Sequence, residues 1–291
     1  MQVSFKTPAH NTDWPSLRHM WREADAIPVY QAGWTFDHLY PWRSDPTGPC
    51  LEGWTLLAAL AVETRRLRLG AMVTSNVYRH PALLAKMAAT LDIVSDGRLE
   101  LGLGAGGDQT EARAFGLALP SMAERIEQLG EACQVFRMLF GQAEASFDGH
   151  YYRLRNARCE PKPVQRPAPP VVIGGRGERL LRVAARWADG WNFPGGPPDE
   201  LRRALDKLRG FCGELGRDAS EISVSAQLTV NREPAVVADA GAELIAAGAD
   251  HLVLVFEPPF RPGRLAAVAD AIDALASPSR VLDDRPTLPS T

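Results

Sequence analysis

Short apolar runs alternate with amphipathic segments along the chain, and the clearest case lies between Leu67 and Gly107. Two β-rich runs, 67–75 and 99–104, flank one helical segment that Pro81 opens and a Ser-Asp-Gly sequence closes. This pattern predicts a βαβ unit whose two parallel strands are buried on both faces. The second strand ends in GLGAGG, where almost no side chains are present, so we expect another group to pack against its backbone.

The same alternation continues on both sides of this unit and predicts eight strands alternating with helices. The expected strands cover residues 3–6, 35–39, 67–75, 99–104, 171–175, 190–193, 222–230 and 252–256. The expected helices cover 14–26, 52–65, 81–95, 122–140, 179–187, 199–215, 236–247 and 261–276, with a loop over 112–120. A closed (β/α)8 TIM barrel, which needs about 250 residues, fits this count and the length of the chain.

One interruption separates the fourth expected strand and its helix from the fifth strand. Residues 146–159 alternate around an Asp-Gly turn and predict a small hairpin, which a proline-rich segment follows. Because the βα rhythm resumes at once, we interpret residues 141–170 as an insertion. We therefore expect a single barrel domain over residues 1–280 and a flexible C-terminal tail over 281–291.

Composition and charge narrow the class of protein. Hydrophobic residues make up 45% and charged residues 23%, and the net charge is −3, without a basic stripe, so we expect no nucleic-acid partner. The four cysteines are scattered without a C-x-x-C pair, which favours reduced thiols in a cytoplasmic protein. We expect no membrane partner, because the start lacks a signal-peptide core and no apolar run is long enough to span a bilayer.

In a barrel of this kind the functional site is built at the C-terminal ends of the strands. At these strand ends, small residues leave much of the backbone accessible and few groups are ionisable. Metal ligands are not clustered, so no metal site is expected, and a G-x-S-x-G motif is absent from the sequence. A large planar cofactor held by backbone amides suits this set better. The candidates are Lys6, Thr7, Asp37, His38, residues 72–76, residues 104–108, residues 174–176, Asn192, Gln227 and Glu257.

Three blocks of sequence carry a resemblance to a known family. RHPALLAKMAATLDIVSDGRLELGLGAG resembles the signature of the luciferase-like monooxygenase superfamily, whose members are (β/α)8 barrels. FDHLYPW at 36–42 and EPKPVQRPAPPVVIGGRGERLLRVAARWADGWN at 160–192 are similar to blocks of its subgroup that uses coenzyme F420, a deazaflavin. The blocks occur in the order that the family has, and they span the chain from Phe36 to about Asn192.

The resemblance implies roles for particular residues. His38 would face the reactive carbon of the deazaflavin and manage the proton that accompanies hydride transfer. Met72 and Val73 would form a non-prolyl cis peptide behind the ring, and the loop that follows the fifth strand would hold the phosphate-bearing tail. The implied cofactor-binding residues are Asp37, Met72, Val73, Thr74, Ala105, Gly106, Gly174, Gly175 and Arg176, and the implied substrate residues are Trp42, Gly107, Asp108 and Asn192.

Two departures from the family pattern change the expected substrate. Gly107 stands where the sugar-phosphate dehydrogenases of this subgroup carry a catalytic glutamate, and FPGGPP at 193–198 lacks their phosphate-binding lysine. Glucose 6-phosphate is therefore not the expected substrate, and any acid must be His38, Asp108 or the substrate itself. Purely structural roles stay open: Asp37 as a turn cap, Trp42 as a packing residue, the glycines as a tight turn, Arg79 and His80 as helix caps, and Glu111 as an ion-pair residue beneath the site.

The sequence therefore predicts an F420-dependent oxidoreductase that transfers hydride to or from a neutral, fairly apolar small molecule. Two alternatives remain: an FMN-dependent monooxygenase, in which His38 stabilises a flavin peroxide, and a flavin-binding protein without turnover, which Gly107 keeps open. A flavin-free aldolase or isomerase would need a Schiff-base lysine, for which Lys6 is the sole credible candidate at a strand end. The resemblance also implies a homodimer.

Overall fold

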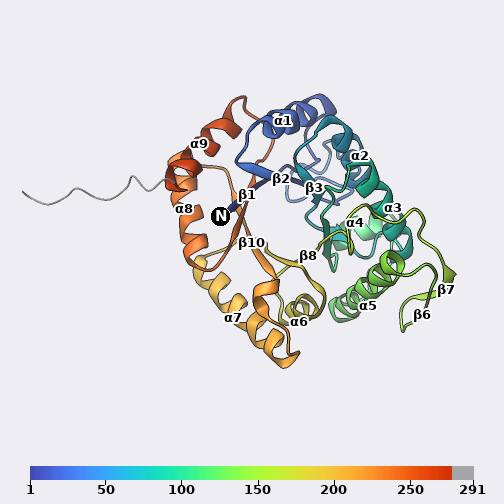
Figure 1. The fold of residues 1–291 in the computed structure, drawn as a ribbon. Helices are drawn as coiled ribbons and strands as arrows, with labels where there is room; N and C mark the ends of the chain where they lie inside the picture. The colour runs from blue at the N-terminus through green and yellow to red at the C-terminus, as the bar shows by residue number, and fades with distance from the viewer. Residues whose placement is uncertain (277–291) are drawn as a thin grey trace, which may run out of the picture.

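Nine strands form one parallel sheet that curves into a barrel, with helices around its outside (Figure 1). The computed structural model describes residues 1–276. The strand order is β3-β2-β1-β11-β10-β9-β8-β5-β4. The strands are β1 (Gln2–Lys6), β2 (Tyr30–Thr35), β3 (Arg68–Ala71), β4 (Thr74–Ser75), β5 (Leu101–Gly104), β8 (Val171–Gly174), β9 (Gly190–Phe193), β10 (Ser223–Thr229) and β11 (His251–Val255).

The two strands at the ends of this order, β3 and β4, are consecutive pieces of one barrel strand. The peptide bond between Met72 and Val73 lies between the two pieces and is cis, as the family resemblance implies. β3 pairs with β2, β4 pairs with β5, and a parallel bridge joins Leu69 to Leu99, so the sheet closes on itself. Eight strand positions around one closed barrel confirm the predicted (β/α)8 fold.

Helices cover the outside of the barrel, and their starts follow local sequence signals. Asp13 caps the first helix, Pro81 begins the third, and Ser121 and Glu124 form the expected capping box. The helices are α1 (Trp14–Ala26), α2 (Gly53–Glu63), α3 (Pro81–Val94), α4 (Gln109–Ala114), α5 (Met122–Gly141), α6 (Glu178–Trp187), α7 (Pro198–Glu214), α8 (Pro234–Ala246) and α9 (Arg264–Ala276), with a 3₁₀ turn, η1 (Ala219–Glu221), before β10.

The expected hairpin is present between α5 and β8. Its strands, β6 (Ala145–Asp148) and β7 (Arg153–Ala157), pair antiparallel and lie outside the ring of helices, beside α5 (Figure 1). No helix within residues 1–276 is both long enough and apolar enough to cross a membrane. The tail expected over 281–291, and the end of the domain expected at 280, lie outside the described residues.

Two of the expected elements differ from the structure. The second strand was predicted over 35–39 but is β2, because Phe36 to Leu39 form the loop that follows it. Gly33 and the exposed Gln31 hide the strand pattern, and Gly33 is required there because rings of Trp21 and Phe5 occupy the space of a Cβ. The loop predicted over 112–120 begins instead inside α4, which Asp108 caps.

Side chains on the inner side of the strands divide the barrel into a filled lower part and an open upper part. Trp34 is fully buried in the barrel, where it packs with Ala32, Met72, Val172 and Val253. On β1, Phe5 points outward into the main core, so the alternation of a strand turns Lys6 inward. These apolar side chains around Trp34 fill the lower part of the barrel. The space above them, at the C-terminal ends of the strands, is available for a site.

Candidate active site

A cavity of about 1400 Å³ opens at the C-terminal ends of the barrel strands. Every strand position contributes at least one residue to its wall, as expected for this fold. These residues include Lys6, Asp37, His38, Met72, Val73, Gly104, Gly174, Asn192, Gln227 and Val255. The other predicted site residues on the wall are Trp42, Ala105, Gly106, Gly107, Asp108, Gly175 and Arg176.

Three of the candidate residues, Thr7, Thr74 and Asn76, are buried and do not line the cavity. The clearest case is Thr74, which was predicted to bind the cofactor. It is fully buried, and its hydroxyl accepts a hydrogen bond of 3.2 Å from Nε1 of Trp54. At this point of the barrel, the residues that line the cavity are Met72 and Val73. Thr74 therefore helps to fix α2 against the barrel, and its side chain does not contact a ligand in the cavity.

His38 is held from behind by a buried carboxylate. Its Nδ1 lies 3.1 Å from Oε2 of Glu111, whose side chain is 2% exposed, whereas that of His38 is 26% exposed. A carboxylate only accepts, so Nδ1 carries the hydrogen and Nε2 is left for the cavity. On its other side, the imidazole stacks on Trp42 with 5.5 Å between ring centroids. The two contacts fix the plane of the ring.

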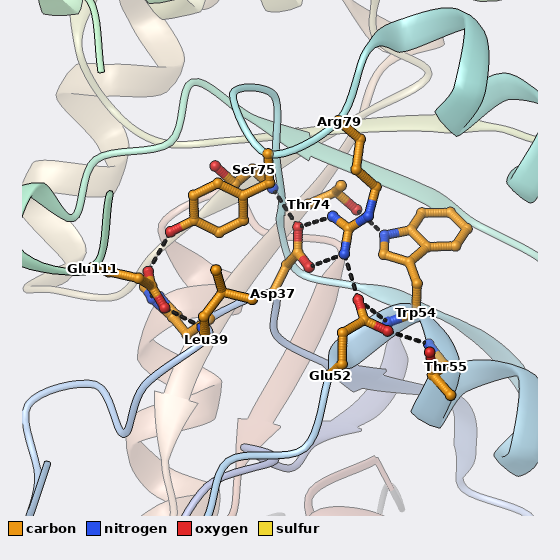
Figure 2. Close-up of polar contacts among 11 residues, drawn as sticks. Asp37, Leu39, Glu52, Trp54, Thr55, Thr74, Ser75, Arg79 and Glu111 are labelled. Atoms are coloured by element: carbon orange, nitrogen blue, oxygen red, sulfur yellow. Dashed lines mark hydrogen bonds and ion pairs between the residues drawn. The ribbon is translucent and has the colours of Figure 1, made fainter. Parts of the chain in front are cut away.

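Glu111 is ionised because its hydrogen bonds outweigh its burial. Burial alone would raise the pKa of this carboxyl group, but donors from His38, Tyr78 and Leu39 lower the pKa below its usual range. Tyr78 donates its hydroxyl to Oε2, and the backbone N–H groups of Leu39 and Tyr40 donate to Oε1, the second at 2.9 Å. Figure 2 shows this carboxylate beside Leu39, at the end of the loop that follows β2. The predicted ion-pair role of Glu111 beneath the site is confirmed, and its partner is the candidate catalytic histidine.

A second buried carboxylate, Asp37, fixes the loop from inside the barrel. Arg79 donates to both of its oxygens, at 2.7 and 3.0 Å, and the backbone N–H of Ser75 donates at 3.0 Å (Figure 2). Arg79 also reaches Glu52, the N-cap of α2. Burial raises the pKa of Asp37, and the bidentate contact with Arg79 opposes that rise. Asp37 therefore is not a turn cap, and the alternative in which Arg79 caps α3 is wrong.

His80, in contrast, does cap α3. Its Nδ1 accepts a hydrogen bond of 3.2 Å from the backbone N–H of Ala82, so the expected capping role is confirmed for this residue.

Glycines at the ends of β5 and β8 make room for a neighbouring side chain. A Cβ on Gly104 would lie 2.4 Å from Cγ2 of Val73, and one on Gly174 would lie 2.6 Å from Cγ1 of the same residue. The expectation that another group packs against this bare backbone is thus met in part by Val73. Gly106 has φ of +73° and faces Ser75, so it also needs glycine, whereas Gly107 has no atom within 4 Å of a built Cβ. The side of the cavity at Gly107 is open.

Asp108 lines the cavity, but one of its carboxylate oxygens is committed to the backbone. Its Oδ1 accepts the N–H of Glu111 at 2.9 Å and so caps α4. Of the two protein groups that the sequence left open as the acid, Asp108 thus has a structural role as a cap, and His38 is the candidate that we retain.

Of the arginines at or near the cavity, two are candidates for holding an anion, and one of these two lines the cavity. Arg176 lines the cavity and pairs with Glu200 at 2.6 Å, with about half of its side chain exposed. Arg125, which sequence reasoning missed, is buried on α5 between Met122 and Ile126, two residues of the cavity wall. Its Nε and Nη1 have no hydrogen-bond partner within residues 1–276, which is rare for a buried guanidinium. Within the same residues, no group of three or more potential ligands could hold a metal ion.

Comparisons with known proteins agree with this architecture. The chain is 30% identical over 201 residues to an F420-dependent glucose-6-phosphate dehydrogenase from Microbacterium testaceum, and the match covers 68% of this chain and 59% of that protein. It is 35% identical over 176 residues to an F420-dependent hydroxymycolic acid dehydrogenase from Mycobacterium tuberculosis, which covers 58% of this chain and 47% of that protein. The matched region thus spans about half of the length of each of these relatives.

Solved structures share the fold over nearly the whole chain. An F420-dependent secondary alcohol dehydrogenase in complex with an F420-acetone adduct superposes with a TM-score of 0.85 at 19% identity, covering 94% of this chain and 98% of that one. A long-chain alkane monooxygenase superposes with a TM-score of 0.79 at 15% identity, covering 95% and 91%. The family model described as luciferase-like monooxygenase matches residues 1–276. The chain therefore belongs to the luciferase-like monooxygenase family.

Proposed function

We propose that this protein is an F420-dependent oxidoreductase that transfers hydride between the deazaflavin and a neutral, fairly apolar small molecule. The observation that carries the proposal is the pair of His38 and Glu111, because it presents one imidazole nitrogen to a cavity at the C-terminal ends of the barrel strands. Two relatives named as F420-dependent dehydrogenases support the choice of cofactor. That the chain forms a homodimer in the cytoplasm stays a prediction.

The residues present fit a deazaflavin. Met72, Val73 and the glycine-rich ends of β5 and β8 form a wall on which a flat ring can lie, and the cavity of about 1400 Å³ is larger than a drug-sized ligand needs. Arg176 lines the cavity at the N-terminus of α6, where an anion is favoured. Arg125 does not line the cavity, but it precedes the wall residue Ile126 and has two buried donors without a hydrogen-bond partner within residues 1–276. When bound, the deazaflavin would supply the hydride chemistry of the site.

The contribution of the chain is to position the reactants and to hold one proton. Glu111 fixes the orientation of His38 through Nδ1 and leaves Nε2 directed at the cavity. Trp42 on one side of the imidazole limits its rotation. His38 would thus give or take the proton that balances hydride transfer, the task of a general acid or base.

The part of the cavity beside Trp42 and α5 is apolar and has room for a substrate. Trp42, Met122 and Ile126 line it, and Gly107 leaves open space where a glutamate side chain would otherwise project. None of these groups favours a phosphate or a polycarboxylate. We infer that the substrate is neutral and that apolar contact provides most of its binding energy.

Turnover can be tested directly. Reduced F420 is mixed with the protein and a panel of neutral ketones and enones without oxygen, and its visible absorbance is followed. We expect turnover by the wild type, a loss of about 10²- to 10⁴-fold in His38→Ala, and no change in His19→Ala, whose side chain is 76% exposed on α1. Equal rates for wild type and His38→Ala would contradict the proposal. Oxygen consumption with reduced FMN would instead favour the monooxygenase alternative.

A further inference from the structure

A polar wall lies across the barrel from the glycines and has no part in the function proposed above. Lys6, His10, Gln227 and Glu257 all line the cavity, and they belong to β1, β10, β11 and the loops that follow. The sheet order places β1, β11 and β10 side by side, whereas β5 and β8, which carry the glycines, are on the other part of the barrel. A flat ring on the glycine side would leave the polar wall to face a substrate.

The hydrogen bonds along this wall leave Lys6 with spare donors. Nζ of Lys6 donates to Oε1 of Gln227 at 3.2 Å, Nε2 of Gln227 donates to Oδ1 of Asn192 at 2.7 Å, and the amide of Asn192 donates to Ser225 at 2.9 Å. An ammonium group has three N–H donors, so this chain uses one of them. No carboxylate within residues 1–276 comes within ion-pair distance of Lys6, and its remaining donors are available to the cavity.

The electrostatic surroundings suit a lysine that exchanges a proton. Burial lowers the pKa of Lys6 to about 8, and the charge of Glu257 opposes that change. Burial also raises the pKa of Glu257, with Lys6 opposing. Nε2 of His10 lies 3.9 Å from the carboxylate of Glu257. Burial lowers the pKa of His10, and the charge of His38 lowers it further. A structural lysine would be expected to form a close ion pair, and this one does not.

We propose that Lys6 binds the carbonyl oxygen of the substrate and exchanges a proton with it, so that the substrates form a ketone or aldehyde and alcohol pair. The inference rests on the proposed function. Reduction of the carbonyl forms a C–H bond with the hydride of the reduced deazaflavin and moves the C=O π electrons to oxygen. An N–H bond of Lys6 breaks as the O–H bond forms, and the resulting amine regains its proton from solvent. In the reverse direction the neutral amine takes the hydroxyl proton of the alcohol.

This role of Lys6 gives Lys6 and His38 different tasks in the cavity. For a carbonyl substrate, Lys6 on the β1 side would exchange the proton that the proposed function assigns to His38. His38, after β2, would then orient the reacting carbon. Because an ammonium group next to a developing oxyanion forms a charge-assisted hydrogen bond, its removal should weaken binding of any oxyanion at this position.

A stable oxyanion tests this site without cofactor. The purified full-length protein is titrated with 4-nitrophenol, whose phenolate is read by visible absorbance. We expect the wild type to bind the phenolate and to lower the apparent pKa of the phenol. Lys6→Met and Lys6→Gln should bind it about 10- to 100-fold more weakly, the factor that one charged hydrogen bond gives. Lys207→Met is the matched control, because that lysine is exposed on α7 and pairs with Glu178.

Thermal unfolding of each variant shows that it is folded, and two replacements of different polarity guard against a single failure to fold. Absence of phenolate binding by the wild type, or equal binding by wild type and both Lys6 variants, would overturn the inference. The phenolate titration contains no F420, so its result does not depend on whether the protein binds F420. A protein that binds the phenolate but not F420 would contradict the proposed function and would still show the oxyanion site. A covalent adduct of Lys6 with a ketone, trapped by borohydride, would also overturn proton exchange in favour of a Schiff base.

Discussion

Replacement of Glu111 by glutamine should misdirect His38 while keeping the shape of the site. The carboxylate receives four donors: Nδ1 of His38 at 3.1 Å, the hydroxyl of Tyr78, and the N–H groups of Leu39 and Tyr40. In Glu111→Gln, the amide oxygen can keep the two backbone donors, but the amide NH2 then faces His38 and Tyr78. Nδ1 must become an acceptor, so that the hydrogen moves to Nε2 and the cavity meets the wrong tautomer.

The expected size follows from the two lost contacts. A hydrogen bond to a charged acceptor is worth about 1.5–3 kcal/mol against about 0.5–1.5 kcal/mol for a neutral one, so two such changes amount to about 2–3 kcal/mol. As transition-state energy this is about a 30- to 150-fold fall in kcat. The assay is anaerobic oxidation of reduced F420 by a ketone that the wild type reduces. Glu214→Gln is the control, because that residue is exposed and pairs with Arg182 on the outer surface.

For the same variant, we also predict how the difference in stability from the wild type depends on pH. The pKa of Glu111 is lowered in the folded protein, so its stabilising contribution is present above the ordinary value of 4.5 and is lost as pH falls through the lower folded value. Urea unfolding should therefore show that wild type and Glu111→Gln differ most above about pH 5 and converge in stronger acid. A kcat within twofold of the wild type, or a stability difference independent of pH, would refute the reasoning about Glu111.

Three further substitutions test other parts of the structure. Gly104→Ala should lower the free energy of unfolding by about 1–3 kcal/mol, because the new Cβ meets Val73 at 2.4 Å, and Val73→Ala should recover part of the loss, which a double-mutant cycle in urea measures. Gly107→Glu should leave stability within about 0.5 kcal/mol, since nothing lies within 4 Å, and should shift the ketone panel toward smaller or more polar substrates. Burial lowers the pKa of His251 to about 4, so this base stays neutral in the folded protein, and its stabilising contribution is lost as pH falls from about 6.5 toward 4. In urea titrations, His251→Gln should remove this part of the dependence of the unfolding free energy on pH, which is at most about 1.4 kcal/mol per pH unit.

The barrel was predictable because its signals are local. Most helix starts have a capping side chain or a proline, and most buried strands read as short apolar runs. The prediction misplaced β2 because Gly33 interrupts its apolar run. Glycine is needed there because the rings of Trp21 and Phe5, which lie on other elements, occupy the space of a Cβ. Helix α4 has a signal in the spacing of Asp108 and Glu111, which is that of a cap and its third helical residue.

The pairings within the site were not predictable in the same way. Glu111 lies 73 residues from His38, and Arg79 lies 42 residues from Asp37, so no periodicity along the chain brings these charges together. The family resemblance identified His38 and the cis peptide, because these belong to short motifs. Arg125 gave no signal, since a charged residue at a helical position reads as an exposed one until its burial is known.

The most direct test of the central claim is an equilibrium titration of the purified protein with F420 and, in parallel, with FMN, followed by fluorescence. We expect F420 to bind with a Kd of about 1 µM or tighter, which is about −8 kcal/mol, and FMN to bind far more weakly. Arg125→Met should weaken F420 binding about tenfold or more, while His38→Ala should leave it within a few fold. Preferential binding of FMN, or equal binding of F420 by wild type and Arg125→Met, would contradict this account of the cofactor and its site.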